Sequence, residues 1–124
     1  MELAPAMCPA MLSVDQKLSA PLPGWAEARM GFAHRLEGMT IYSGHPSTRA
    51  SRVPDRTEGA GDHRQKDVWD VPTVKQSAWM ECAYYSTDVT IRREVPNGAS
   101  RCWAEFDTKM VLDGKPQLLR AGCD

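Results

Sequence analysis

The fold is decided by residues 77–85, Ser-Ala-Trp-Met-Glu-Cys-Ala-Tyr-Tyr, in the second half of a chain of 124 residues. Successive side chains of a β-strand point to opposite faces of the sheet. Both faces of this stretch are largely apolar, with Trp79, Ala83 and Tyr85 on one and Met80, Cys82 and Tyr84 on the other. A strand that is apolar on both faces is covered on both, so we expect this stretch to lie at the centre of a sheet.

Further strand-like segments lie on both sides of this central stretch. Residues typical of strands, separated by turn residues, occur at 39–42, 68–71, 88–95, 101–107 and 109–112. Pro96-Asn97-Gly98 and Asp113-Gly114 are typical of β-hairpin turns, because Asn or Asp followed by Gly tolerates a positive φ. Weaker patterns favour an edge strand at 14–18 and a strand at 25–34. The sequence therefore predicts a mainly β fold built on an antiparallel meander sheet, with a small α+β fold as the alternative.

Residues 47–67 contain almost no large apolar residue and carry many charges, together with Pro54, Gly59 and Gly61. A segment of this composition cannot bury itself, so we expect one long polar loop on the surface, with a helical turn near 47–52. The length of the chain suits a single hydrophobic core. We therefore predict one domain that spans residues 1–124 and displays this loop.

The composition argues against two classes of partner. Lys and Arg number 15 against 16 Asp and Glu, which leaves a formal net charge of −1. Recognition of nucleic acid needs clustered excess cations, so no nucleic acid partner is expected. The apolar runs are far shorter than the roughly 20 residues that span a bilayer, so no integral membrane segment is expected.

Cys8, Cys82, Cys102 and Cys123 form an even set without a Cys-x-x-Cys pair, which favours two disulfides in an oxidising compartment over a zinc or redox site. Four buried reduced thiols in a cytosolic protein are the alternative. Three pairings are open. A turn at residues 86–87 places Cys82 opposite Ile91, and a turn at Gly98 places Ile91 opposite Glu105, so Cys82 and Cys102 would lie two strands apart. A hairpin at Asp113-Gly114 returns Cys123 close to Cys102. Strand register therefore favours Cys8 with Cys82 and Cys102 with Cys123.

A spaced set of residues resembles an uncharacterised family of small exported proteins of Gram-negative bacteria. The set comprises Cys8-Pro9, Leu36-x-Gly38-Met39-Thr40-Ile41-Tyr42-x-Gly44-x-Pro46, Val53-Pro54-Asp55, Trp69, Trp79-x-x-Cys82-x-Tyr84-x-x-Thr87-x-Val89-x-Ile91, Val95-Pro96 and Cys102. The resemblance covers roughly residues 8–107. It implies a precursor with a signal peptide, a periplasmic or secreted location and no established activity. Residues 1–8 themselves lack a basic start followed by an apolar run, so no signal peptide is visible and export is implied by the resemblance rather than seen.

The sequence predicts no catalytic, cofactor-binding or metal site, and no cofactor. His34, His45 and His63 lack ligand spacing, so we interpret them as surface or turn residues. Glu81 and Glu105 could act as a hydrolytic pair only if they faced one cleft, and salt bridges to Arg92 or Arg93 explain Glu81 equally well.

Two further groups of side chains could contact a partner. Arg92-Arg93 with Lys109 could form a basic spot, although a solvated strand face is the simpler interpretation. The tryptophans could stack on a sugar or a protein partner, but in so small a chain we expect them mainly in the core. They are Trp25, Trp69, Trp79 and Trp103.

The leading hypothesis is therefore a non-enzymatic exported binding or inhibitor module of the bacterial envelope. An immunity protein against an envelope-targeting toxin is one form of it, and an envelope protein is the expected partner. A hydrolase built on a carboxylate pair and a structural envelope protein are the alternatives. Because a small sheet has free edges, the expected state is a monomer or a weak dimer.

Overall fold

The computed structural model describes residues 6–28, 33–59, 61–71, 77–112 and 114–124. These residues form strands and one short 3-10 turn, η1, at Pro46–Thr48. The strands are β1 (Ala6–Met7), β2 (Met11–Ser13), β3 (Ala33–Ser43), β4 (Ser51–Arg52), β5 (Arg56–Gly59), β6 (Arg64–Asp70), β7 (Ala78–Tyr84), β8 (Ile91–Glu94), β9 (Arg101–Leu112) and β10 (Lys115–Cys123). The predicted mainly β fold is confirmed.

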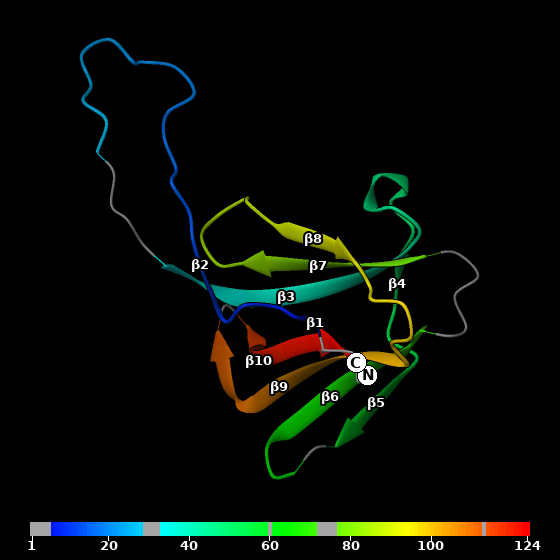
Figure 1. Cartoon of the computed structure of the whole chain (residues 1–124). Helices are drawn as coiled ribbons and strands as arrows, with labels where there is room; N and C mark the ends of the chain where they lie inside the picture. Colours follow the sequence, from blue (N-terminus) through cyan, green and yellow to red (C-terminus); the bar gives the residue numbers. More distant parts are fainter. Residues whose placement is uncertain (1–5, 29–32, 60, 72–76, 113) are drawn as a thin grey trace.

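The strands form two antiparallel sheets that face each other as two layers (Figure 1). The first sheet has the order β1-β10-β9-β6-β5, and the second has the order β2-β3-β7-β8, with β4 added beside β3. The apolar stretch at residues 77–85 contains β7, which lies between β3 and β8. Its predicted central position in a sheet is therefore correct.

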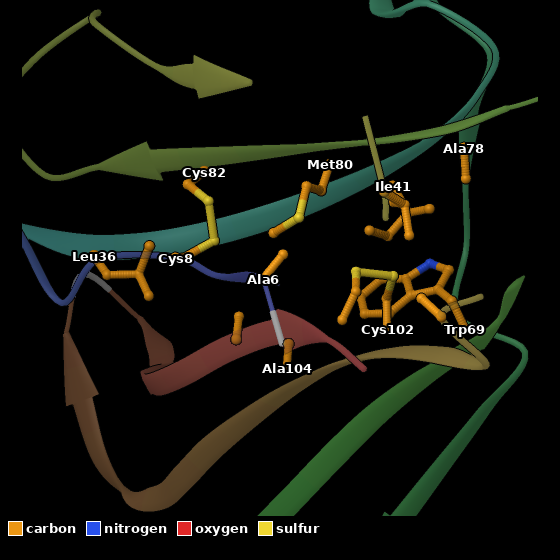
Figure 2. Packing of buried hydrophobic residues seen from close by; sticks show 14 of the residues in the cluster. Ala6, Cys8, Leu36, Ile41, Trp69, Ala78, Met80, Cys82, Cys102 and Ala104 are labelled. Atoms are coloured by element: carbon orange, nitrogen blue, oxygen red, sulfur yellow. A yellow bond between two sulfur atoms is a disulfide. The ribbon is translucent and has the colours of Figure 1, made fainter. Parts of the chain in front are cut away.

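The core fills the space between the two sheets (Figure 2). β7 directs Met80, Cys82 and Tyr84 inward, where all three are buried. β3 adds Leu36 and Ile41 from the same sheet, and the first sheet contributes Cys102, Ala104 and Leu118 from the other side. Each large aliphatic side chain buried in this way contributes about 1.5–3 kcal/mol of transfer free energy, so the core depends on both layers.

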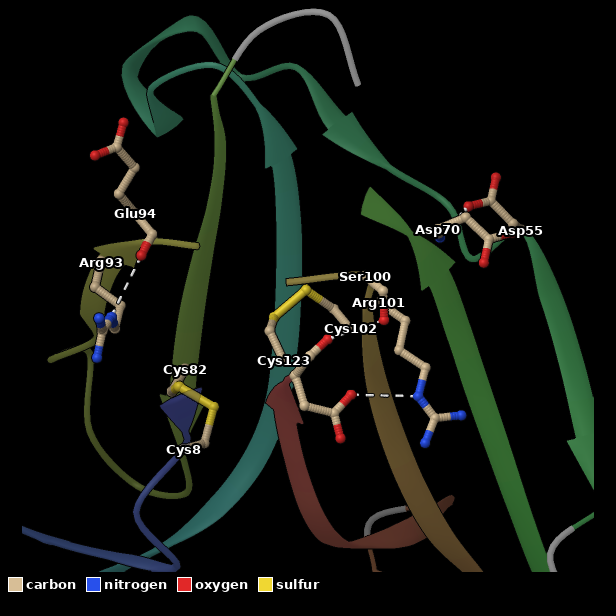
Figure 3. Close-up of a disulfide and its surroundings, with 11 residues drawn as sticks. Cys8, Asp55, Asp70, Cys82, Arg93, Glu94, Ser100, Arg101, Cys102 and Cys123 are labelled. Atoms are coloured by element: carbon tan, nitrogen blue, oxygen red, sulfur yellow. Dashed lines mark hydrogen bonds and ion pairs between the residues drawn. A yellow bond between two sulfur atoms is a disulfide. The ribbon is translucent and has the colours of Figure 1, made fainter. Parts of the chain in front are cut away.

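Two disulfides join distant segments of the chain (Figure 3). Cys8 is bonded to Cys82 with their Cα atoms 5.8 Å apart, which ties the N-terminal segment to β7. Cys102 is bonded to Cys123, and these two residues lie directly opposite each other in the β9–β10 ladder. Cys82 lies opposite Ile91, as the register argument assumed. Both bonds are the pairs that strand register favoured.

The Pro96-Asn97-Gly98 turn does not make the hairpin that its sequence suggested. Gly98 has the expected positive φ of 88°, and Ala99 N–H donates to the Pro96 carbonyl oxygen. However, β8 pairs with β7 whereas β9 pairs with β10 and β6, so this turn carries the chain from one sheet to the other. Turn residues report only the local backbone angles, and they do not decide whether the flanking strands pair. The predicted alignment of Ile91 with Glu105 was wrong for this reason.

The prediction of a long loop at residues 47–67 was also wrong. This segment contains β4, β5 and the start of β6, and the β5–β6 hairpin forms an edge of the first sheet. It lacks an apolar pattern because an edge hairpin is stabilised by its backbone ladder and by ion pairs rather than by burial. Arg56 supplies two such pairs, to Glu58 and to Asp70, each at 2.8 Å.

The long excursion is instead residues 14–28, which follow β2 and extend away from both sheets (Figure 1). The edge strand predicted at 14–18 is therefore absent, and residues 25–28 of the strand predicted at 25–34 are not in a strand. Residues 29–32 of that prediction lie outside the described residues. Alternation of apolar and polar residues predicts a strand only where one face of that strand is buried. The apolar residues of this segment are covered by no other part of the described structure, so their spacing did not indicate a strand.

Candidate partner-binding surface

Glu81 and Glu105 are not brought together. Glu81 lies on β7 outside the core cluster, where Arg92 Nε donates to its Oε2 at 2.5 Å and Tyr42 donates to its Oε1 at 3.3 Å. Glu105 lies on β9 in the other sheet, where Arg120 Nε donates to its carboxylate at 2.6 Å. Each carboxylate therefore neutralises an arginine on the outer face of its own sheet. This arrangement does not supply the facing pair that acid hydrolysis requires.

Tyr42 takes part in the Glu81 network. Burial raises the pKa of its hydroxyl, and the neighbouring Glu81 carboxylate raises this pKa further through its charge and its hydrogen bond, while Arg92 opposes the shift. Tyr42 therefore stays a neutral hydrogen-bond donor. The same contact uses Arg92, so the predicted basic spot is partly neutralised. Arg93 donates to the Glu94 carbonyl oxygen, and Lys109 lies in the other sheet.

The histidines serve three separate local roles. His34 is buried and its Nδ1 hydrogen-bonds the Tyr85 carbonyl oxygen at 2.8 Å, so the prediction of a surface position was wrong for this residue. His45 is exposed, accepts a hydrogen bond from Ser47 N–H at the start of η1, and contacts the Trp79 ring edge-on at 4.7 Å. His63 sits in a turn with positive φ. Within the described ranges, no group of His, Cys, Asp and Glu has the arrangement of a metal site.

The four tryptophans differ in how far they are buried. Trp69 is buried in the core and its Nε1 donates to the Arg52 carbonyl oxygen at 3.1 Å. Trp103 is buried on the outer face of the first sheet, with the Lys66 ammonium 5.3 Å from its ring centroid. Trp79 is partly buried. Trp25 is 79% exposed, so the core interpretation holds for Trp69 and is wrong for Trp25.

A pocket of about 300 Å³ opens between the two sheets, and we call it the inter-sheet pocket. The second sheet and the turn after β7 supply Glu37 and Tyr85, and the first sheet supplies the other side. Its full lining is Glu37, Gln65, Asp67, Tyr85, Phe106, Lys115 and Pro116. The lining thus combines aromatic rings with two carboxylates and one amine, which is the usual composition of a binding pocket.

Two irregularities in the ladders shape this pocket. Leu36 pairs with Tyr84 and Gly38 pairs with Ala83, so Glu37 is the extra residue of a β-bulge. Between β9 and β10 the register changes from Pro116–Val111 to Gln117–Asp107, which leaves residues 108–110 as extra chain. Bulges redirect side chains and are common beside binding sites. Here they turn a carboxylate into the opening and bend the β9–β10 hairpin next to it.

Hydrogen bonds hold the second bulge in place. Asp107 accepts from the Lys109 N–H at 2.9 Å and forms an ion pair with Arg64 at 2.9 Å. The Lys109 backbone donor is the main cause of a lowered pKa of the Asp107 carboxyl, and Arg64 adds to it. Thr108 N–H also donates to the His63 carbonyl oxygen. The hairpin beyond the bulge is therefore held at a defined angle.

The end of this hairpin displays three consecutive apolar residues, Met110, Val111 and Leu112, which we call the hairpin tip. All three are exposed, and Leu112 pairs with the pocket residue Lys115. Three consecutive apolar residues on the surface are unfavourable in water, and such a run commonly marks a site that a partner covers. The sequence signal was present, because the three residues directly precede Asp113-Gly114, but the sequence alone could not show that neither face of this strand end is covered.

The excursion between β2 and β3 begins at the same end of the molecule. We call residues 14–28 the N-terminal loop. Its base is the pair Ser13–Ala33, which lies four residues along β3 from Glu37, or about 13 Å at roughly 3.3 Å per residue. The inter-sheet pocket, the hairpin tip and the base of the N-terminal loop thus share one end of the two-layer body, which we call the open end (Figure 1).

Among the described residues, no helix has the length and apolar character needed to cross a membrane.

Comparisons with known proteins give a family but no close relative. No curated protein and no solved structure matches the chain. Residues 28–124, which include the inter-sheet pocket and the hairpin tip, match the family model of the type VI secretion system Tli immunity protein. This match covers well over half of the chain, and the chain therefore belongs to the type VI secretion system Tli immunity protein family.

Proposed function

We propose that this chain is a non-enzymatic immunity protein that binds a toxin delivered by a type VI secretion system and neutralises it. The family match over residues 28–124 is the observation that carries the proposal. The two carboxylates considered for hydrolysis lie in different sheets and are each paired with an arginine, so the geometry favours binding over catalysis.

The open end is the proposed contact surface. The hairpin tip supplies apolar area, and the inter-sheet pocket beside it supplies Glu37, Asp67 and Lys115 as polar contacts. Thr57 donates to Asp67 at 2.9 Å, whereas no contact within the described residues engages the Glu37 carboxylate. An apolar centre with polar groups around it is the usual composition of a specific protein interface. The surrounding sheets and disulfides keep this surface preformed, which lowers the entropy cost of binding.

The proposed place of action is the periplasm. Both disulfides need an oxidising compartment to form and persist, and the periplasm is such a compartment. An immunity protein there would meet a toxin that acts on the envelope before the toxin reaches its target.

The test pairs the purified, oxidised chain with each type VI effector encoded in the same genome. We expect one effector to form a stable complex by calorimetry and size-exclusion chromatography. We also expect periplasmic production of the chain to restore growth of a host that produces this effector in the periplasm. If no effector binds and growth is not restored, the proposal is wrong.

A matched pair of variants locates the contact surface. Replacement of Met110, Val111 and Leu112 by serine should weaken the complex at least tenfold, because apolar residues at the centre of an interface carry most of the affinity. Val53→Ser is the control, since Val53 is 82% exposed and lies outside the open end. Equal affinity of the hairpin-tip variant and the control would place the contact elsewhere while leaving the immunity function intact.

A further inference from the structure

The N-terminal loop displays large apolar side chains that no core covers. Every residue from 15 to 28 is exposed, including Leu18 at 45%, Leu22 at 56% and Trp25 at 79%. Tryptophan is the residue type most enriched among the dominant contacts of protein interfaces. A single exposed apolar residue needs no explanation, but three within one projecting loop form a patch that a partner would stabilise.

The loop has a shape of its own. Trp25 N–H donates to the Leu22 carbonyl oxygen at 3.1 Å across a turn in which Gly24 has a φ of 85°. Leu18 N–H donates to the Glu27 carboxylate at 2.6 Å, which draws the two sides of the loop together. The side chains of Leu18, Leu22 and Trp25 line a hollow of about 390 Å³ between these two sides. The apolar groups are thus held close to one another.

The base of the loop is fixed to the two-layer body. β2 pairs with the start of β3, and Leu36 N–H donates to the Ala10 carbonyl oxygen at 2.9 Å. Tyr84 donates to the Pro9 carbonyl oxygen at 2.8 Å, and Cys8 is bonded to Cys82 just before this point. A contact made by the loop therefore acts on the whole body, which avoids much of the ordering cost that a free chain end would have on binding.

Residues 14–27 of the loop precede the stretch that matches the family model. The family match begins at residue 28, whereas the hairpin tip and the inter-sheet pocket lie inside it. The loop nevertheless begins at the open end, four residues along β3 from Glu37. Its base therefore lies beside the proposed contact surface.

We propose that the N-terminal loop is a second contact to the toxin, which inserts Trp25, with Leu18 and Leu22 around it, into an apolar cleft of that protein. The proposal rests on the proposed immunity function. Its occupant is the toxin rather than a second copy of the chain, because the loop extends from the same end as the shared contact surface. The contact adds the exposed apolar area of the N-terminal loop to that of the hairpin tip.

The experiment compares the wild-type chain with a loop variant that carries Leu18→Ser, Leu22→Ser and Trp25→Ser. These side chains are outside the core, so the melting temperature should stay within about 2 °C of wild type. We expect binding of the effector identified above to weaken at least 100-fold in calorimetry, with most of the loss in the dissociation rate. Trp25→Phe, which keeps an aromatic ring, should retain most of the affinity, and Val53→Ser is again the control.

Three outcomes would overturn the proposal, and they can be told apart. If the wild-type chain binds the effector and the loop variant binds it equally well, only the loop contact is wrong. If the free wild-type chain is a dimer by light scattering and the loop variant is a monomer, the loop binds a second copy instead of the toxin. If the wild-type chain binds no effector, the immunity function and the loop contact both fail.

Discussion

At the scale of single residues, Gly122 shows how closely two strands can approach. It lies in β10 opposite Met7 of β1. A Cβ atom at this position would lie 2.5 Å from the Ala6 carbonyl oxygen, 2.6 Å from Met7 Sδ and 3.2 Å from Met7 Cα. The methionine sulfur could move, but the backbone oxygen could move only if β1 shifted away from β10.

We therefore expect Gly122→Ala to lower the free energy of unfolding by about 1–3 kcal/mol, the usual cost of overpacking. Gly59→Ala is the matched control, because Gly59 is also in a strand and has open space where the Cβ would lie. Its effect should stay within about 0.5 kcal/mol. Urea denaturation measures both. Equal stability of the two variants would mean that β1 does not lie against β10 as described.

At the scale of elements, the two disulfides have different tasks. The Cys8–Cys82 bond spans 74 residues and ties the segment before the N-terminal loop to the second sheet. The Cys102–Cys123 bond spans 21 residues and joins two strands that already pair. A covalent link stabilises mainly by restricting the unfolded chain, and the restriction grows with the length of the closed loop.

Replacing Cys8 and Cys82 by serine should therefore cost about 1 kcal/mol more stability than replacing Cys102 and Cys123, from the ratio of the two loop lengths. Guanidinium denaturation of the two double-serine variants under oxidising conditions measures this difference. If the proposed loop contact is correct, the first variant should also bind the effector more weakly, because the base of the N-terminal loop is less restrained. A larger loss of stability from the shorter link would show that native packing, rather than chain entropy, dominates.

At the scale of the whole molecule, the chain is two sheets that share one core, and the open end is its proposed contact surface. The oxidised state of all four cysteines links this architecture to a compartment. We expect protein isolated from its native compartment to show no free thiol by mass spectrometry after denaturation without reductant, and four after reduction. Four free thiols in the unreduced sample would contradict export and would move the proposed neutralisation of a toxin to the cytosol.

The family resemblance found in the sequence was informative only in part. It indicated a small protein of bacteria, which fits the family found by comparison, but it did not name that family. Many residues of the resemblance have a structural role. Leu36, Ile41, Trp69, Cys82 and Tyr84, for example, are core residues. Core residues preserve a fold, whereas a binding partner contacts exposed residues, and for this reason the pattern could not indicate a partner.

Several features could be determined from the sequence alone because they depend on neighbours along the chain. The alternation in β7 showed which of its side chains point to each face, and the two-sided apolar character placed it inside a sheet. The turn predicted at residues 86–87 set Cys82 opposite Ile91, and this pair is observed. Each of these follows from the fixed two-residue period of a strand and the backbone angles of a turn.

Only the tertiary structure decided which strands share a ladder, where the bulges at Glu37 and 108–110 fall, and that residues 14–28 rather than 47–67 leave the body. Val95 and Ala99 are buried on either side of the turn that separates the sheets, although the same turn residues would suit a hairpin. The physical reason is that strand pairing is chosen by the burial of all apolar faces together, and this collective free energy has no counterpart in any local pattern.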